Sequence, residues 1–394
     1  MSISKNKDLI QEIITRGVNE VIDAKHLVER LNSGKQLIVK LGIDPTSPNI
    51  HLGRAVPLLK LRDFQNLGHK VIFIVGDATA LVGDTSDKSA ERPMLPLETV
   101  KKNMQTYIEQ ASKILDKNKL EVRYNSQWLN KLGYLEIGPQ ADQFSLAEFM
   151  SRENIKKRYD EGKRVSLREL LYPLMQGYDS VMIKADVEIG GTDQRFNLLA
   201  GRTLQSYYHQ EPQDIIMGNL ILGTDGRKMS SSWGNTINIV DEPPEMFGKV
   251  MSIPDDLIII YFEHCTRLPM VEVKAFEKEL QNGKTNPRDI KMILAKEIVK
   301  TYWNESKSLE AEKYFVSVFQ KKETPDEIIV YKLAGKNIID VLILSKLADS
   351  KSEARRLINQ KSIKINDEVI DSSEIVVSKN SVIQKGKRYF IKVE

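Results

Sequence analysis

Two short segments of the sequence combine residue types that suit phosphate chemistry. The first joins residues 42–46 (GIDPT) to residues 51–54 (HLGR), directly after an expected strand and at the start of an expected helix. A helix N-terminus beyond a strand end favours phosphate through its free N–H groups and its dipole. Gly53 lets a nucleotide lie close to the backbone, and the His51 imidazole can donate to a phosphate oxygen. Alone, such a four-residue pattern more often marks a surface histidine.

The second segment, residues 226–232 (GRKMSSS), follows the last expected strand of the same region. Its Gly and Ser content predicts a mobile loop that presents one cation, Lys228, and several hydroxyls. Donors aimed at charge that develops during a reaction lower the barrier most, so this loop suits a polyphosphate that loses pyrophosphate. A solvated surface loop remains the alternative interpretation of this segment alone.

Both segments need a sheet that brings strand ends together. The first half alternates β-rich runs with helical patterns, which predicts a parallel sheet covered on both faces. The expected strands are 37–41, 70–75, 120–124, 182–189 and 214–222. Between the first two strands, apolar residues at helical spacing end at Gly68, and a longer helix is expected over 98–115.

Beyond this region the pattern changes twice. Residues 241–327 lose their strands and predict an all-helical domain, with prolines at its entry. Ser350 and Glu353 have capping-box spacing, so a helix is expected there, followed by strands at 362–365, 375–377 and 389–393. We therefore expect three domains: a Rossmann-like α/β domain over 1–240, a helical domain over 241–327 and a small α+β domain over 336–394.

Composition excludes several classes of protein. With 394 residues, 41% hydrophobic and 28% charged, the chain is neither disordered nor fibrous. A single cysteine, Cys265, excludes an internal disulfide and fits a cytoplasmic location. Residues 1–16 lack the apolar core of a signal peptide, and no membrane span is expected. Five histidines and one cysteine offer no zinc-site spacing, so no structural metal is expected.

Charge is concentrated in the tail. Residues 336–394 hold 12 Lys and Arg against 8 Asp and Glu, so the whole net charge of +4 lies there. A basic surplus on a small domain is typical of a phosphate-backbone binder, although a solvated surface is an equal alternative on charge alone.

Together, in this order and each at a strand end, the two phosphate segments resemble the HIGH and KMSKS signatures of class I aminoacyl-tRNA synthetases. Two departures are visible: Arg54 stands at the second histidine of HIGH, and Ser231 at the second lysine of KMSKS. Arg54 keeps a cationic donor, whereas Ser231 loses a charge. Lys228 should therefore make a larger share of the contacts that stabilise the phosphates.

Residues 172–179 (YPLMQGYD) resemble the tyrosyl branch of that class. The resemblance implies that Tyr172 holds the ammonium of the substrate, that Gln176 binds nearby, and that Asp179 accepts from the substrate phenol. A carboxylate can accept from a phenol and would be left unpaired by phenylalanine. The alternative is a helix whose Tyr and Gln simply face the core.

Two further segments resemble the same branch. In residues 190–194 (GGTDQ), the resemblance places Asp193 on the ribose hydroxyls of ATP and Gln194 beside the reacting carboxylate. Lys40 departs from the pattern, because many bacterial members have a tyrosine there that contacts the substrate phenol. Asp179 would then carry more of the recognition, or another group would supply the contact.

The loop 82–92 (VGDTSDKSAER) is similar to a family loop with trailing cations. The resemblance implies that Asp84 binds the substrate ammonium and that Lys88 and Arg92 meet pyrophosphate. In the tail, residues 352–358 followed by 364–366 resemble a small RNA-binding domain first known in a ribosomal small-subunit protein. Arg355 and Arg356 would there meet RNA phosphates.

The resemblance implies an enzyme that activates tyrosine with ATP and Mg²⁺ and transfers it to tRNA(Tyr), acting as a homodimer. The residues that it assigns to catalysis are Thr46, His51, Lys88, Arg92 and Lys228. Those that it assigns to ATP are Gly53, Arg54, Asp193, Lys228, Ser230 and Ser231. Those that it assigns to tyrosine are Asp44, Asp84, Tyr172, Gln176, Asp179 and Gln194. The alternatives are a tryptophanyl enzyme, a small-molecule nucleotidyltransferase and a catalytically silent RNA-binding relative.

Overall fold

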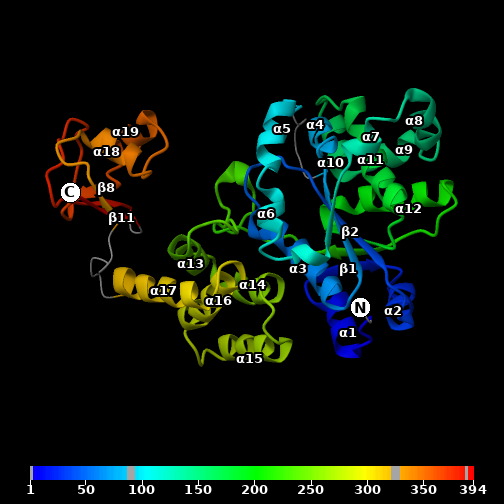
Figure 1. The fold of residues 1–394 in the computed structure, drawn as a ribbon, viewed down its shortest axis with the longest axis horizontal. Helices are drawn as coiled ribbons and strands as arrows, with labels where there is room; N and C mark the ends of the chain where they lie inside the picture. Colours follow the sequence, from blue (N-terminus) through cyan, green and yellow to red (C-terminus); the bar gives the residue numbers. More distant parts are fainter. Residues whose placement is uncertain (1–2, 87–93, 321–328, 387–388) are drawn as a thin grey trace.

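A six-stranded sheet forms the centre of the first half of the chain (Figure 1). The computed structural model describes residues 3–86, 94–320, 329–386 and 389–394. The strand order is β1-β6-β5-β2-β3-β4, and all neighbours are parallel except β1, which pairs antiparallel with β6. The strands are β1 (Val18–Ile22), β2 (Ile38–Ile43), β3 (Lys70–Val75), β4 (Leu120–Tyr124), β5 (Val187–Gly191) and β6 (Asp214–Gly218). The predicted α/β class with a parallel sheet is confirmed.

Helices cover this sheet because the connections between parallel strands must cross its faces. Before β5 they are α1 (Lys7–Thr15), α2 (Ala24–Ser33), α3 (Leu52–Asn66), α4 (Thr79–Val82), α5 (Leu97–Met104), α6 (Tyr107–Ala111), α7 (Ser126–Leu129), α8 (Tyr134–Ala141), α9 (Leu146–Met150), α10 (Glu153–Asp160) and α11 (Leu167–Ile183). After β5 comes α12 (Arg195–Tyr207). The buried faces of α3 and of the central strands meet in one large apolar core.

Three sequence predictions in this half need correction. The strand expected over 182–189 begins only at Val187, because α11 continues to Ile183 and ends with Lys184 in the left-handed conformation. The helix expected over 98–115 is divided into α5 and α6. The strand expected over 214–222 ends at Gly218. β1 was not predicted, because its burial is only partial and its apolar residues do not form a continuous run.

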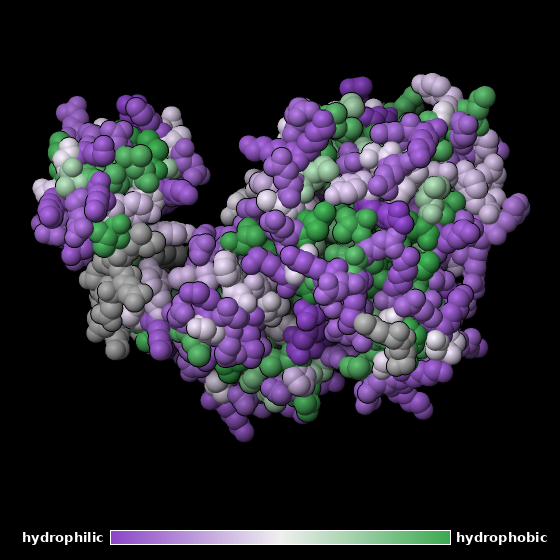
Figure 2. All heavy atoms as spheres, in the orientation of Figure 1, coloured by the Kyte–Doolittle hydropathy of each residue, from purple (hydrophilic) through white to green (hydrophobic). Residues whose placement is uncertain are grey.

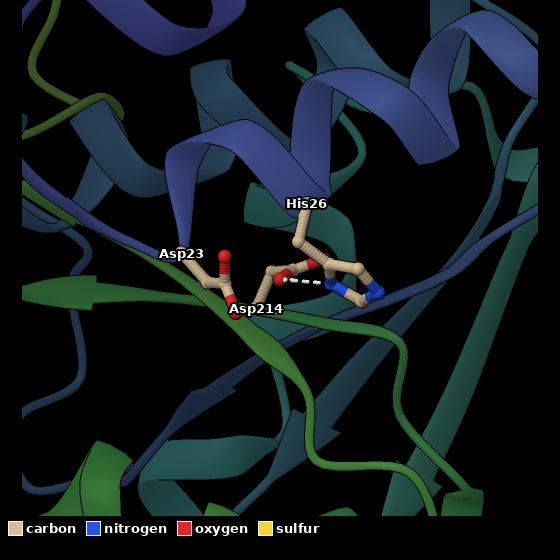
Figure 3. Close-up of side chains that lie close together, drawn as sticks. All are labelled: Asp23, His26 and Asp214. Atoms are coloured by element: carbon tan, nitrogen blue, oxygen red, sulfur yellow. Dashed lines mark hydrogen bonds and ion pairs between the residues drawn. The ribbon is translucent and has the colours of Figure 1, made fainter.

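Helix α2 is clamped to the sheet by a small polar cluster (Figure 3). His26 Nδ1 lies 2.9 Å from Asp214 Oδ1, and Arg30 donates to the other Asp214 oxygen at 3.4 Å. The hydrogen bond with Asp214 raises the pKa of His26, and burial raises the pKa of Asp214. Asp23, His26 and Asp214 could each offer one atom to a metal. Both Asp214 oxygens already have partners in the described structure, so the cluster joins α2 to β6.

The next region is helical. Its members are α13 (Pro243–Met251), α14 (Ile258–Cys265), α15 (Met270–Gln281), α16 (Pro287–Tyr302) and α17 (Glu305–Phe315). Two helices begin with proline at the first turn, where the missing N–H costs nothing. The apolar faces of these helices join the same large core as the sheet. Within the described residues, no helix is both long and apolar enough to cross a membrane.

The tail has a core of its own. Its elements are β7 (Ile329–Tyr331), α18 (Ile338–Leu344), α19 (Lys351–Asn359), β8 (Ile363–Ile365), β9 (Glu368–Val369), β10 (Val382–Lys385) and β11 (Tyr389–Val393). Ser350 caps α19 by accepting from Glu353 N, as the sequence predicts. The strand expected at 375–377 is wrong, since only an isolated bridge from Asn337 to Val376 forms there. Hydrophilic side chains spread over the visible face of the tail (Figure 2).

Candidate active site

A cavity of about 730 Å³ opens at the carboxyl ends of β2, β5 and β6, beside the N-terminus of α3. Ligands of open α/β sheets bind at this edge, because the helices that follow the strands begin there. Both phosphate segments line the cavity, and so do residues of the two tyrosyl-like segments. The topology therefore brings together the four segments that sequence reasoning singled out separately.

His51 is the N-cap residue of α3 and is only 8% exposed. Burial lowers its pKa to about 3, and the nearby cations Arg54 and Lys228 act in the same direction. The imidazole is therefore neutral at physiological pH and can donate one hydrogen bond. Its buried Nδ1 has no hydrogen-bond partner among the described residues. A Cβ on Gly53 would lie 3.1 Å from this ring, so glycine suits the close approach.

Arg54 is fixed beside Thr46. Its guanidinium donates to Thr46 Oγ1 at 2.7 Å and to the hydroxyl of Tyr107 at 2.8 Å. Tyr107 in turn donates to the carbonyl of Ser47 at 2.8 Å. The arginine that departs from the HIGH pattern is thus held rigidly at the cavity wall, with its charge next to the first helical turn.

The serine-rich loop is closed by one buried amide, Asn235. Its side chain accepts from the backbone N–H of Ser230 at 2.9 Å and donates to Asp225 Oδ1 at 2.7 Å and to the carbonyl of Lys228 at 3.1 Å. Lys228 Nζ reaches across to Asp193 Oδ2 at 3.1 Å. The loop therefore places its lysine beside the aspartate expected on the ribose.

The methionine of the loop is anchored to helix α3. Met229 is 3% exposed, and its Sδ accepts from the backbone N–H of Gly53 at 3.4 Å. Ser230 and Ser232 share a hydrogen bond of 2.9 Å, and Ser231 begins a short 3₁₀ turn. All three serines line the cavity.

A second group of polar residues surrounds Asp44. Tyr172 donates its hydroxyl to Asp44 Oδ2 at 2.9 Å, and Thr79 donates to Asp44 Oδ1 at 2.7 Å. Burial raises the pKa of Asp44 to about 6 and that of Tyr172 well above its usual range. Asp44 is therefore mainly ionised at pH 7 and suits an ammonium group.

Asp84 lies next to this group. Gln194 donates to Asp84 Oδ2 at 2.7 Å, and Ser86 donates from its backbone and its hydroxyl to Asp84 Oδ1 at 3.0 and 2.6 Å. Asn197 fixes the other end of the Gln194 amide at 2.8 Å. The cavity thus offers two oriented carboxylates, Asp44 and Asp84, to one substrate cation.

Asp179 is more deeply placed than the other predicted residues. Gln176 and Glu188 line the cavity, whereas Asp179 lies outside the set of described lining residues and is 4% exposed. Its oxygens accept from Trp128 Nε1 at 2.7 Å and Asn125 Nδ2 at 3.3 Å. Burial raises its pKa to about 7.

Comparison with known proteins identifies this arrangement. The family described as "tRNA synthetases class I (W and Y)" matches residues 32–320, and the family described as "Tyrosine--tRNA ligase SYY-like C-terminal domain" matches residues 320–393. The "Tyrosine--tRNA ligase 2" of Clostridium acetobutylicum is 48% identical, with 99% of each chain covered. The chain belongs to the tyrosyl-tRNA synthetase family.

Other members agree with this assignment. The "Tyrosine--tRNA ligase" of Carboxydothermus hydrogenoformans is 48% identical over 97% of each chain. The crystal structure of the tyrosyl-tRNA synthetase of Archaeoglobus fulgidus, complexed with L-tyrosine, has a TM-score of 0.62 at 20% identity and covers 77% of this chain and 99% of that one. At this identity the likeness shows the shared fold.

Most of the site residues that were predicted from the synthetase signatures line one cavity. Lys88 and Arg92 lie outside the described residues. Arg355 and Arg356 are exposed on α19, in the tail. Sequence reasoning missed four residues that hold the site together. Three are polar residues at positions that the pattern makes buried, and the fourth, Trp128, reads as an ordinary buried aromatic residue. They are Asn125, Trp128, Glu188 and Asn235.

Proposed function

We infer that this chain is a tyrosine–tRNA ligase that activates L-tyrosine with ATP and transfers the tyrosyl group to the 3′ end of tRNA(Tyr). One observation carries the inference: a neutral phosphate-facing imidazole and a lysine loop share a single cavity with two carboxylates oriented for an ammonium. The family to which the chain belongs supports the same activity.

In the first step, a carboxylate oxygen of tyrosine attacks the α-phosphorus of ATP. The new bond joins that oxygen to phosphorus, and the bond from the α-phosphorus to the bridging oxygen breaks, so pyrophosphate leaves with the electron pair. No side-chain nucleophile is required. Thr46, His51 and Lys228 would align the phosphates and stabilise the developing charge, with Lys88 and Arg92 meeting pyrophosphate.

Substrate binding divides between the two ends of the cavity. We assign Gly53, Arg54, Asp193, Ser230 and Ser231 to ATP, because they border the phosphate segments. We assign Asp44, Asp84, Tyr172, Gln176, Asp179 and Gln194 to tyrosine. Mg²⁺ would arrive with ATP, bound by phosphate oxygens and water, and would neutralise phosphate charge. His51, Arg54 and Lys228, which face the phosphates, are neutral or cationic, so they fit a metal held by the nucleotide.

In the second step, the terminal ribose hydroxyl of tRNA attacks the tyrosyl carbonyl carbon, and AMP leaves. We assign backbone binding of tRNA to the tail, where Arg355 and Arg356 are exposed on α19. The three domains would be 1–240 for both substrates, 241–327 for the anticodon region and 336–394 for RNA backbone contacts. The separate apolar core of the tail supports a distinct third domain, whose sheet also includes β7 (Ile329–Tyr331).

We further propose a homodimer that works in the cytoplasm. Helices α8 to α11 carry large apolar side chains that a monomer would leave in water, and such a patch marks an interface. The most exposed are Tyr134, Leu135, Leu146 and Leu167. Light scattering at working concentration tests the dimer, and replacing Leu135 and Leu167 by glutamate should give a monomer.

Exchange of labelled pyrophosphate into ATP, run with each of the twenty amino acids, tests the activity. Tyrosine alone should support rapid exchange, and tryptophan should not. Exchange that depends on tryptophan would support the tryptophanyl alternative. No exchange with any amino acid, from folded protein that still binds tRNA, would support a catalytically silent relative.

A further inference from the structure

The short segment 82–86, which carries Asp84, is held by residues of α10 and α11. Thr85 is held at two points and is buried. Its hydroxyl donates to Glu169 Oε2 on α11 at 2.7 Å, and its backbone carbonyl accepts from the side chain of Asn154 on α10. The position of the segment beside the cavity is therefore set by these two helices.

The two helices are joined at this point by a buried ion pair. Arg158 on α10 and Glu169 on α11 are each 1% exposed, and the guanidinium donates to both carboxylate oxygens. Glu169 also accepts from the backbone N–H of Ser166 at 3.1 Å. A buried carboxylate is stable where a cation and further donors compensate its lost hydration. The anchor of the segment is thus fixed by partners of its own.

Arg152, at the N-cap position of α10, reaches from this anchor to Ser86. Its Nη2 donates to Ser86 Oγ at 2.9 Å, and Asn197 Nδ2 on α12 donates to the same oxygen at 3.3 Å. The hydroxyl of Ser86 in turn donates to Asp84 Oδ1 at 2.6 Å. A serine hydroxyl has one proton to donate and two lone pairs that accept. Because donors occupy both lone pairs of Ser86, its proton is directed at Asp84.

The guanidinium of Arg152 is itself held in place. It lies over the ring of Phe196 on α12, with Cζ 5.1 Å from the ring centroid. Phe196 packs in turn against Phe149 on α9, with ring centroids 5.2 Å apart. A planar guanidinium can stack on an aromatic face and still donate hydrogen bonds in its own plane. Arg152 is therefore oriented by a stacking contact as well as by its hydrogen bond.

These contacts end at Asp84, which lines the cavity. Its Oδ1 accepts from the backbone N–H and the hydroxyl of Ser86, and its Oδ2 accepts from Gln194 at 2.7 Å. Arg152 and Ser86 both lie outside the set of described lining residues. Arg152 can therefore affect a ligand of the cavity through the orientation of Asp84, without touching the ligand.

We propose that Arg152 is a positioning residue for tyrosine, which acts through Ser86 to orient the Asp84 carboxylate toward the substrate ammonium. The proposal rests on the proposed function, which places the ammonium at Asp84. Hydrogen bonds weaken when donor and acceptor are misaligned, and a carboxylate that must be ordered on binding costs affinity. Arg152 thus increases the affinity for the amino acid by fixing its acceptor in advance.

The experiment compares four variants with the wild type: Arg152→Met, Ser86→Ala, the double variant and Lys156→Met. Methionine keeps an unbranched apolar stem beside Phe196 and removes the donor. Lys156→Met is the matched control, because it removes an exposed cation from the same helix. Calorimetric titration compares tyrosine with desaminotyrosine, the analogue that lacks the ammonium. Pyrophosphate exchange gives kcat and the KM values for tyrosine and ATP.

Arg152→Met should weaken the binding of tyrosine by about fivefold, the scale of the net contribution of one hydrogen bond. Binding of desaminotyrosine should stay near the wild-type value, because that ligand has no ammonium for Asp84. The KM for tyrosine should rise while kcat and the KM for ATP stay unchanged. Ser86→Ala should show the same pattern, and the double variant should lose no more than Ser86→Ala alone, since Arg152 acts through that hydroxyl. Lys156→Met should match the wild type.

Three results would overturn the proposal. Equal weakening of tyrosine and desaminotyrosine would mean that Arg152 only supports the local fold. Additive losses in the double variant would mean that it does not act through Ser86, and a raised KM for ATP with unchanged tyrosine binding would assign it to the nucleotide. If Arg152→Met does not fold, Ser86→Ala still decides, because it must weaken tyrosine alone. Absence of tyrosine-dependent exchange in the wild type would instead contradict the proposed function.

Discussion

Replacing His51 by alanine removes the neutral donor at the start of α3. The imidazole is 8% exposed, and burial lowers its pKa to about 3, so it acts as a neutral hydrogen-bond donor at pH 7. Losing one donor aimed at developing charge costs about 10²- to 10³-fold in kcat. Because the donor is uncharged and two cations, Arg54 and Lys228, remain beside it, we expect the lower end, about 10²-fold.

The pH dependence of this variant follows from the same pKa. The folded protein binds a proton at His51 only near pH 3, whereas the unfolded chain binds one near pH 6.5. The unfolded state therefore holds more protons between these values, and His51 makes folding less stable as pH falls, by up to about 1.4 kcal/mol per pH unit. His51→Ala should lose less stability than the wild type between pH 6 and 4 in urea titrations.

Single-turnover formation of the adenylate, with tyrosine affinity measured separately, is the deciding assay. The matched control is His209→Asn, an exposed histidine in the left-handed conformation that asparagine tolerates. His51→Ala should lower the rate of adenylate formation while tyrosine affinity stays near the wild-type value. A wild-type rate, or a loss confined to tyrosine affinity, would refute the role assigned to this imidazole.

Three further outcomes are expected. Asp179→Asn should keep the packing but lower the preference for tyrosine over phenylalanine by about tenfold or more, since an amide replaces the carboxyl group; unchanged selectivity in exchange assays would exclude Asp179 as the residue that recognises the phenol. Replacing Arg355 and Arg356 by glutamate should weaken the charging of tRNA and reduce its dependence on salt, while pyrophosphate exchange stays intact. If the variant charges tRNA as the wild type does at every salt concentration, these arginines do not bind RNA. Cys265 is fully buried with a pKa raised by burial to about 12, so a thiol reagent should react with it only after denaturation, and rapid reaction of native protein would contradict the packing of α14.

The sequence predicts those parts of the fold whose signal is local. β3 has the predicted bounds because its apolar run is continuous, and β4 has them because its apolar residues alternate with charged ones. The cap of α19 by Ser350 was predicted for a similar reason, since its partner Glu353 is three residues away. The start of the strand expected over 182–189 was wrong, because the apolar residues Met182 and Ile183 fit the end of a helix as well as a strand.

Pairing between distant residues could not be predicted from one sequence. Lys40 was noticed only as a departure from a family pattern, and nothing in its neighbours indicates Glu188, which lies on another strand. The same holds for Asp179 and Trp128, whose hydrogen bond joins two helices. A sequence pattern can indicate that a polar residue is buried, but the identity of its hydrogen-bond partner depends on the order of the strands in the sheet.

The hydrogen bonds of Asn235 also limit how the serine-rich loop, residues 226–232, can rearrange when a nucleotide binds. Asn235 bonds to Asp225, to the carbonyl of Lys228 and to the N–H of Ser230 at once, so the two arms of the loop are already joined before any ligand binds. Much of the conformational entropy that a flexible loop would lose on binding has therefore been lost during folding. Lys228 and Ser230 are therefore held in a fixed arrangement relative to each other at the edge of the cavity.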